Sequence, residues 1–324
     1  MGIEVPQARA LLALVVGIGL GVANDEAGAA ISQASVTAPG GFVAAYAGMG
    51  NGSAPFAGGN FTTSYVAGDF NADEKLFAGG GASASASYSG PLSVNSASGF
   101  ASFGLLGFQA QNNSSNSGFG QGTMNGGWTD GILIDAPGLT GQAGLWVGLV
   151  AVEGSLHGAG FAAAASFNVT AYKNGTQLRL SDAAGLFDPG SQWTPFSTDR
   201  QATRWAISTF GGTASMAVND VATFVVPFVY GQAFDFGVYA AAVSGKRSSS
   251  GVAGNSTSDV LFHNTLWWAG TAGVLAGGAP VLDFSITSES GTNWAQAVNA
   301  VPLPAPVALL LAPLALVAAR RRRI

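Results

Sequence analysis

The 324-residue sequence contains no cysteine and only 2 histidines. Without cysteine the chain has no disulfide framework, no thiolate metal ligand and no cysteine nucleophile. Two imidazoles also leave little material for histidine-based metal sites or acid–base catalysis. The missing cysteine is compatible with export, because many exported bacterial proteins have no disulfides.

Charge is also scarce. Charged residues make up 9% of the chain, against roughly 25% in an ordinary soluble domain. Four of the 12 basic residues are adjacent, at Arg320, Arg321, Arg322 and Arg323. The rest of the chain is therefore more acidic than its net charge of −5 suggests, and the absence of a basic patch argues against nucleic-acid binding.

What the chain does contain is apolar surface. Hydrophobic residues reach 48%, with 20 Phe and 7 Trp, alongside 48 Gly. A disordered chain carries far less apolar surface, so we expect a packed core. Short alternating segments lie between turns rich in Gly, Asn and Ser, and no long helical periodicity occurs. The pattern predicts one all-β domain over residues 30–300, a β-sandwich or jelly-roll-like body.

Two local pairings are also expected. Asn174-Gly175 stands between apolar segments and predicts a two-residue hairpin, because both turn positions need positive φ. The segments 221–230 and 234–243 are both apolar, and we interpret them as another strand pair.

The N-terminus has the organisation of a secretory signal peptide. Arg9 provides a thin positive region, residues 10–23 form an apolar stretch, and Ala27-Gly28-Ala29 suits a signal peptidase. We expect cleavage after Ala29, with Ala23 as the second choice, so that residues 1–29 are removed. The alternative is an uncleaved membrane anchor, but the apolar stretch is shorter than the ~20 residues that span a bilayer.

The C-terminus has the order of a stop-transfer segment. Residues 301–319 are apolar, contain Pro313 and are followed by the four arginines. Nineteen residues are just enough to cross a membrane, and the arginines hold the tail on the cytoplasmic side. The segment begins with a proline-rich pentapeptide that stays extended and open to a protease. The pentapeptide is Val301, Pro302, Leu303, Pro304 and Ala305.

This tail resembles the VPLPA variant of the PEP-CTERM sorting signal, in which an exosortase in the membrane recognises the pentapeptide. The resemblance covers about the last 24 residues, and segments 130–144, 264–270 and 284–294 are more loosely similar to bodies of such proteins. It implies export in a Gram-negative bacterium that makes extracellular polysaccharide, with signal peptidase and exosortase as processing partners. An ordinary C-terminal membrane anchor is the alternative.

Residues 68–74 (GDFNADE) suggest a calcium site. Asp69, Asn71 and Asp73 place oxygen ligands at alternate positions, as in calcium loops. However, Glu74 stands where such loops have glycine, and Gly80 stands where they have a bidentate glutamate. The alternative is an acidic surface turn, and no other cofactor is indicated.

Trp267 and Trp268 are adjacent, so in a strand one indole faces the core and the other faces outward. An outward indole can stack on a sugar ring, unless a sheet edge or loop covers it. His157, expected at a strand end, and His263 show no nucleophile and orienting acid nearby in sequence.

These observations favour an exported protein of the cell envelope or matrix, with a structural or interaction role in exopolysaccharide and no enzymatic activity. Its low-charge, Gly-rich and Ser-rich face would meet matrix polymers. A carbohydrate-binding module that uses residues 263–268 is the first alternative. A polysaccharide hydrolase or lyase is the second, and it needs paired carboxylates in a cleft.

Overall fold

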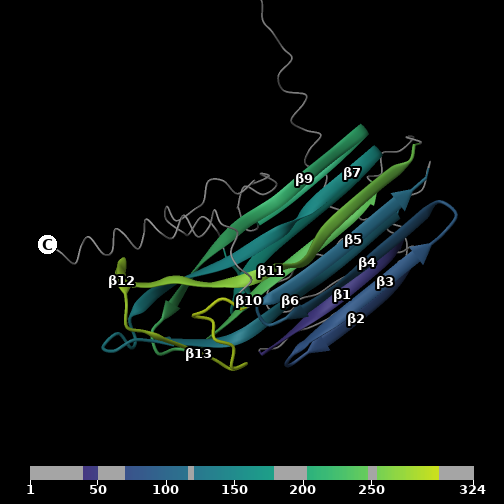
Figure 1. Ribbon diagram of the computed structural model, residues 1–324. Helices are drawn as coiled ribbons and strands as arrows, with labels where there is room; N and C mark the ends of the chain where they lie inside the picture. Colours follow the sequence, from purple (N-terminus) through teal and green to yellow (C-terminus); the bar gives the residue numbers. More distant parts are fainter. Residues whose placement is uncertain (1–38, 50–69, 116–119, 179–202, 247–253, 299–324) are drawn as a thin grey trace, which may run out of the picture.

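A computed structural model describes residues 39–49, 70–115, 120–178, 203–246 and 254–298 (Figure 1). The described residues form thirteen strands and no helix. The expectation of an all-β body is confirmed. None of the described residues forms a helix long and apolar enough to cross a membrane. The predicted signal peptide and the predicted C-terminal segment lie outside the described residues.

The strands belong to one continuous antiparallel sheet, in the order β2-β1-β6-β10-β7-β11-β5-β4-β3. Strands β8, β9, β12 and β13 are attached to the sides of this order. The bounds are β1 Gly40–Met49, β2 Phe70–Phe77, β3 Gly81–Ser89, β4 Ser93–Ser102, β5 Leu105–Ser114, β6 Gly120–Asp135, β7 Ala143–Lys173, β8 Thr176–Gln177, β9 Thr203–Val229, β10 Phe234–Lys246, β11 Ser256–Ala276, β12 Ala279–Val281 and β13 Ser285–Ser288.

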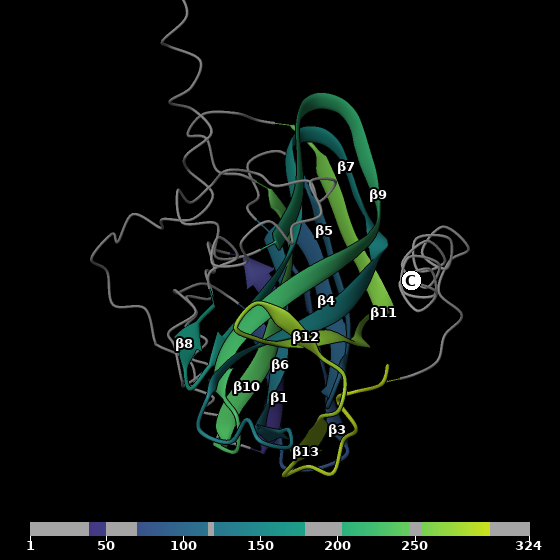
Figure 2. The same ribbon diagram turned by 90° about the vertical axis from the view of Figure 1, so that its left-hand side faces the viewer.

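The sheet folds over on itself because the long β7–β9 ribbon bends. The first half of β7 pairs with β11 and its second half pairs with β10, while β9 stays paired along both halves. The bend falls at Gly160 (φ 87°) and Ala162 (φ 59°) of β7, opposite Gly211 and Gly212 of β9, which also have positive φ. Figure 2 shows the ribbon arching over one end of the molecule. Strands that change direction in this way make the corners of packed sheets.

We call the two halves layer A and layer B. Layer A contains the first half of β7 with the second half of β9, and β11, β5, β4 and β3. Layer B contains the second half of β7 with the first half of β9, and β10, β6, β1 and β2. Strands of the two layers also contact each other face to face, for example β1 with β4 and β6 with β5.

The layers approach closely because β6 carries glycines on its inner face. A Cβ added at Gly122 would lie 2.4 Å from the carbonyl oxygen of Ser96 and 2.8 Å from that of Gln111. A Cβ at Gly126 would lie 2.9 Å from the ring of Phe108. The main chain of β6 therefore packs directly on β4 and β5, where ordinary side chains would hold the sheets ~10 Å apart.

The interior between the layers changes character along its length. Toward the bend it is polar: the amide of Asn95 donates to the Gly48 carbonyl at 2.9 Å, and the Ser244 hydroxyl donates to the Ser258 carbonyl at 2.6 Å. The ammonium of Lys246 donates to the Gly254 carbonyl at 2.6 Å. These bonds satisfy groups that would otherwise be costly to bury.

The opposite end is aromatic and closed by the segment after β12. The indole of Trp294 stacks on Trp128, with ring centroids 4.3 Å apart, and donates to the buried carboxylate of Asp130 at 2.7 Å. The same carboxylate accepts bonds from the main-chain N–H and the hydroxyl of Ser290. Trp268 donates to the Trp294 carbonyl at 2.8 Å. Residues 285–298, the last described part of the chain, are thus held against both layers by these contacts.

Two local expectations have different outcomes. The Asn174-Gly175 hairpin is confirmed: it joins β7 to β8, and φ is 47° and 73° at its two residues. The pairing of segments 221–230 and 234–243 is wrong, because β9 pairs with β7 in layer A whereas β10 pairs with β6 and β7 in layer B. The turn between them carries the chain from one layer to the other.

Substitution of Gly122 tests the close approach of the layers. Gly122→Ala places a methyl group against two carbonyl oxygens, so we expect a loss of about 2 kcal/mol in the free energy of unfolding, measured by urea denaturation. Gly79→Ala is the control, because a Cβ there meets nothing within 4 Å, and its effect should stay within about 0.5 kcal/mol. Equal midpoints for the two variants would contradict the packing described above.

Candidate functional site

The outer face of layer A carries rows of polar side chains across all six of its strands. One row consists of directly paired residues, Ser215, His157, Asp259, Gln111, Ser96 and Ser87, taken from β9 to β3. The adjacent row consists of Ala217, Ser155, Leu261, Gln109, Ser98 and Ser85. We call these two rows the polar face. With strands about 4.8 Å apart, each row is about 24 Å long.

Strand alternation produces this face. In β7, Leu156 points into the core and is 1% exposed, whereas His157 is exposed. In β5, Phe108 and Ala110 are buried while Gln109 and Gln111 point outward. Because successive side chains in a strand point to opposite faces, the alternating apolar and polar sequence gives one packed side and one open side.

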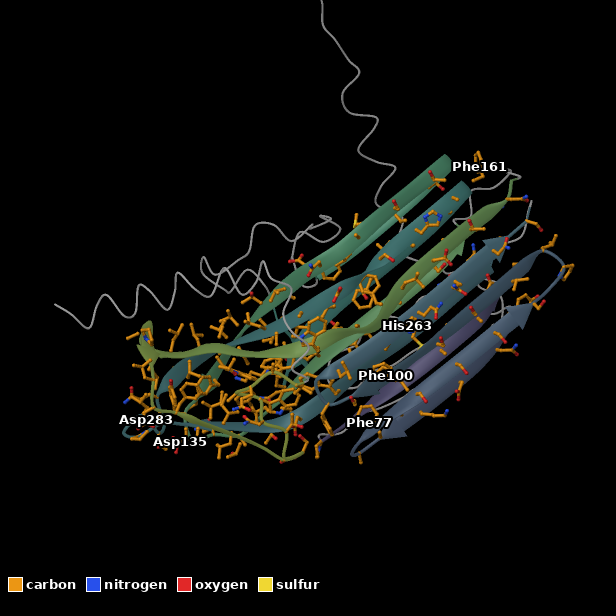
Figure 3. The ribbon with its side chains drawn as sticks, viewed as in Figure 1. Phe77, Phe100, Asp135, Phe161, His263 and Asp283 are labelled. Carbon is orange, nitrogen blue, oxygen red and sulfur yellow. The ribbon has the colours of Figure 1, made fainter. Side chains whose placement is uncertain are left out.

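Neighbouring polar side chains on this face bond to one another. The hydroxyl of Ser96 donates to the side-chain oxygen of Gln111 at 3.3 Å, and His263 bonds to the side-chain oxygen of Gln109. Figure 3 shows His263 on β11 and Phe100 on β4, on the outside of the same layer. Both histidines of the chain therefore lie on layer A. His157 lies inside β7, and its expected position at a strand end is wrong.

Asp259 is the carboxylate of these rows. It lies directly opposite His157 in the β11–β7 register. Partial burial raises the pKa of the Asp259 carboxyl, and the charge of His157 opposes that rise. Charged side chains are thus as scarce on this face as in the whole chain, and hydroxyl and amide groups are its main hydrogen-bonding groups.

Ser215, His157 and Asp259 are residue types found in nucleophilic triads, and here they occupy three neighbouring strands. A triad also needs free main-chain N–H groups that stabilise an oxyanion. On a continuous sheet those groups are engaged in the ladder. Residue types alone therefore do not make this row a catalytic centre.

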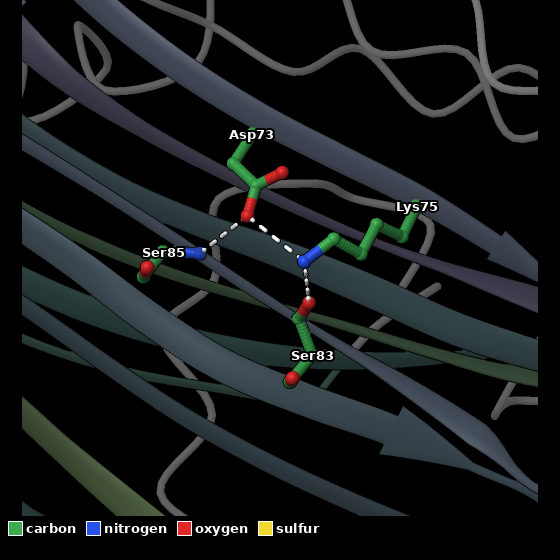
Figure 4. Close-up of polar contacts among 4 residues, drawn as sticks. All are labelled: Asp73, Lys75, Ser83 and Ser85. Atoms are coloured by element: carbon green, nitrogen blue, oxygen red, sulfur yellow. Dashed lines mark hydrogen bonds and ion pairs between the residues drawn. The ribbon is translucent and has the colours of Figure 1, made fainter.

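The calcium motif lies partly in the described chain. Asp69 lies outside the described residues, whereas Asn71 and Asp73 belong to strand β2. The carboxylate of Asp73 lies 3.3 Å from the Lys75 ammonium and accepts a bond from the Ser85 N–H at 3.0 Å (Figure 4). Among the described residues no group of three or more His, Asp or Glu side chains is placed to hold a metal ion.

The alternating polar residues of β2 instead close the edge of β3. Lys75 donates to the Ser83 carbonyl at 2.8 Å, and Asn71 donates to the Ser87 carbonyl. Together with the Asp73 bond, these contacts cover main-chain groups on the edge of β3 that faces β2. An uncovered edge is a template for pairing with another chain. The expected loop is a strand, and its polar residues bond to the neighbouring layer.

The two tryptophans expected to include a sugar contact are both buried. Trp268 is 0% exposed and belongs to the aromatic end of the core, and Trp267 faces outward from layer A but is 4% exposed. Stacking on a sugar needs an open ring face. Neither indole has one in this structure, so we do not assign sugar contact to this pair.

A second polar group, on the outer face of layer B, was not found from the sequence. The hydroxyl of Tyr46 donates to the Glu74 carboxylate, and burial raises the pKa of Tyr172 and of Tyr239. Asn125 is 0% exposed on the same face. These residues lie on the five strands β1, β2, β6, β7 and β10, and spacing along the sequence does not show that such distant segments are neighbours. Their burial makes this group less accessible to a large ligand than the polar face.

Comparison with known proteins adds no family to this description. No protein-family model matches the chain, and no curated protein sequence matches it.

The raised pKa of Asp259 predicts how stability depends on pH. Between the ordinary value of 3.8 and the higher folded value, the folded state binds more protons than the unfolded state, so stability falls as pH rises through this window. Asp259→Asn removes the ionisable carboxyl group and, with it, this loss of stability at higher pH. We expect the variant to melt above the wild type at neutral pH and to match it below 3.8. Asp283→Asn, at an exposed position, is the control, and an equal pH dependence in both variants would contradict the assignment.

Proposed function

We propose that this chain is an exported bacterial envelope or matrix protein, sorted by an exosortase, whose all-β body binds neutral polysaccharide through the polar face. Its fold is a two-layered body of the β-sandwich or jelly-roll type. The observation that carries the binding proposal is the polar face, where Ser, Gln, His and Asp fill ten of the twelve paired positions across six strands and Ser and Gln are the commonest of them. Hydroxyl and amide groups match the donors and acceptors of an uncharged sugar polymer.

The position of the polar face on six paired strands supports binding of an extended polymer in preference to a small molecule. Small-molecule sites are concave and bury most of the ligand. A row about 24 Å long can instead contact several sugar units at once, and each exposed hydrogen bond contributes modestly. Weak contacts repeated along a polymer give useful retention through multivalency.

Hydrolysis or elimination of the polymer has less support from this face. An inverting glycosidase holds two carboxyl groups roughly 6.5–9.5 Å apart, and a retaining enzyme holds them closer. On the outer face of layer A, Glu153 lies four residues along β7 from His157, the residue paired with Asp259. Four residues of strand span about 13 Å. We therefore propose a binding role and no catalytic role for the polar face.

The two ends of the sequence support export and sorting. Ala27 and Ala29 suit signal-peptide cleavage, and residues 301–305 with Arg320–Arg323 match the parts of the sorting signal. The body ends close to that signal, because Val298 is still hydrogen-bonded to Trp268 at 2.9 Å. Calcium remains a minor proposal for Asp69, Asn71 and Asp73, since Asp73 is already paired with Lys75.

Polysaccharide retention tests the binding proposal. We expect wild-type protein to be retarded in a gel that contains dextran, a neutral glucan, and less so in one that contains alginate, because both alginate and the protein are negatively charged. The Gln109→Ala, Gln111→Ala double variant should lose retention about tenfold, since each removes a hydrogen-bonding amide from the middle of a row. Gln232→Ala, an exposed glutamine in the β9–β10 turn, is the control. Equal retention of all three proteins would remove the polar face as a binding site.

Mass spectrometry of the mature protein from cell and medium fractions tests sorting. We expect an N-terminus at Ala30 and no peptides from residues 306–324. The Pro302→Ala, Pro304→Ala double variant should accumulate as uncut precursor, because the recognition pentapeptide is lost. Pro280→Ala in β12 is the control and should be processed normally. A mature wild-type protein that still contains its arginine cluster would reject exosortase processing.

A further inference from the structure

An apolar stripe lies on the outer face of layer A, toward the end that Trp294 closes. It is formed by alternate residues of β7 and by the residues paired with them on β9 and β11. Its members are Leu145, Val147, Leu149, Ala151, Val225, Trp267 and Leu275. Val147, Val225 and Trp267 are 7%, 5% and 4% exposed.

Toward the bend, apolar side chains on the same face are more exposed to solvent. Leu261 of β11 is 37% exposed and Val94 of β4 is 54% exposed, although both point outward like the stripe. Among the described residues, the apolar side chains packed with Val147 and Val225 are Leu145 and Leu275, their own neighbours in the stripe. The sheet itself therefore does not account for the burial of Val147 and Val225.

The last described residue, Val298, lies next to the stripe. The N–H of Val298 donates to the carbonyl of Trp268 at 2.9 Å, and Trp268 follows Trp267 directly. A Cβ added at Gly104 would lie 2.8 Å from the side chain of Val298, so Val298 lies against the β4–β5 turn. The seven residues 299–305 can reach about 25 Å from this point.

The segment that follows matches the stripe in chemistry and in length. Residues 306–319 (PVALLLAPLALVAA) contain no charged or hydrogen-bonding side chain. As a helix, fourteen residues are about 21 Å long. The stripe runs along β7 from Leu145 to Ala151, six residue steps or about 20 Å. In water, an exposed helix of this composition would be strongly unfavourable.

We propose that residues 306–319 dock on the apolar stripe whenever they are not in a membrane. The body then shields its own tail in water, and membrane insertion releases the tail and exposes the stripe. This inference goes beyond the proposed function, because it requires neither polysaccharide binding nor exosortase cleavage. It requires only that the apolar tail and the folded body are present in one chain.

Photocrosslinking of the full chain tests the docking. Benzoylphenylalanine at position 147 should crosslink to peptides from residues 301–319 in aqueous buffer, identified by mass spectrometry. The crosslink should fall about tenfold after addition of phosphatidylcholine vesicles, because the bilayer competes for the tail. The same probe at position 94, exposed on the same face, is the control and should not crosslink to the tail. Crosslinks from position 147 to residues 179–202 or to a second copy, or no crosslink, would overturn the proposal.

Fluorescence of a truncated chain provides an independent measurement. In a chain that ends at Ala300, Trp267 loses its cover, so acrylamide quenching should increase. A Trp267→Phe background should abolish the increase, because Trp128, Trp146, Trp268 and Trp294 remain buried in the core. Unchanged quenching after truncation would show that another segment covers the stripe and would overturn the proposal.

Discussion

The structure depends on how closely its two layers approach each other. Glycines on the inner face of β6 let the β6 main chain rest on the carbonyls of β4 and β5, and alanines line much of the rest of the interior. Dispersion contacts weaken steeply with distance, so the close approach of the two main-chain layers itself stabilises this thin part of the core. One group of large aromatic side chains gathers at the end that Trp294 closes. A second group joins the two layers at Phe167 and Phe262, whose stacked ring centroids are 3.9 Å apart.

The thin core explains why the polar residues lie where they do. A layer packed on Ala and Gly leaves little interior volume for Gln or His. The polar groups that do enter the core, such as Asn95, Ser244 and Lys246, donate to main-chain carbonyls. The Gln and His side chains of layer A point outward, and pairing across six strands aligns polar side chains into rows. The polar face is thus a consequence of the packing, and its chemistry follows from composition.

Sequence reasoning found the class of fold but not the arrangement of its strands. Alternation and turn residues identify strands, and the Asn174-Gly175 turn defines one hairpin because its geometry is local. Pairing between distant strands depends on packing, which local patterns do not encode. Segments 145–156 and 162–172 each have the pattern of a separate strand in the sequence, yet they form one strand that bends at Gly160 and Ala162. The bend uses positive φ at an alanine, where sequence gives no warning.

The candidate sites show the same limit. Asp69, Asn71 and Asp73 fit a calcium loop when read alone, and the same alternation also fits a strand, since both use side chains at every second position. The bonds that Asn71 and Asp73 make to the main chain of β3 could not be read from the sequence, because they depend on where β3 lies. Similarly, the pairing of His157 with Asp259 joins residues about a hundred positions apart, which no local motif could indicate.

The outer face of layer A combines two chemistries that would be incompatible if both were open to water. Hydroxyl and amide rows are suited to solvent, whereas a buried stripe of Leu, Val and Trp is suited to an apolar partner. Residues 306–319 carry no charged or hydrogen-bonding side chain, so in water they need an apolar cover. Placing the stripe where Val298 leaves the body solves this problem within one molecule, because a tethered segment binds at high effective concentration without needing high intrinsic affinity. The same tether makes release simple: a bilayer offers the tail burial on all sides, whereas the stripe covers only one side of a helix.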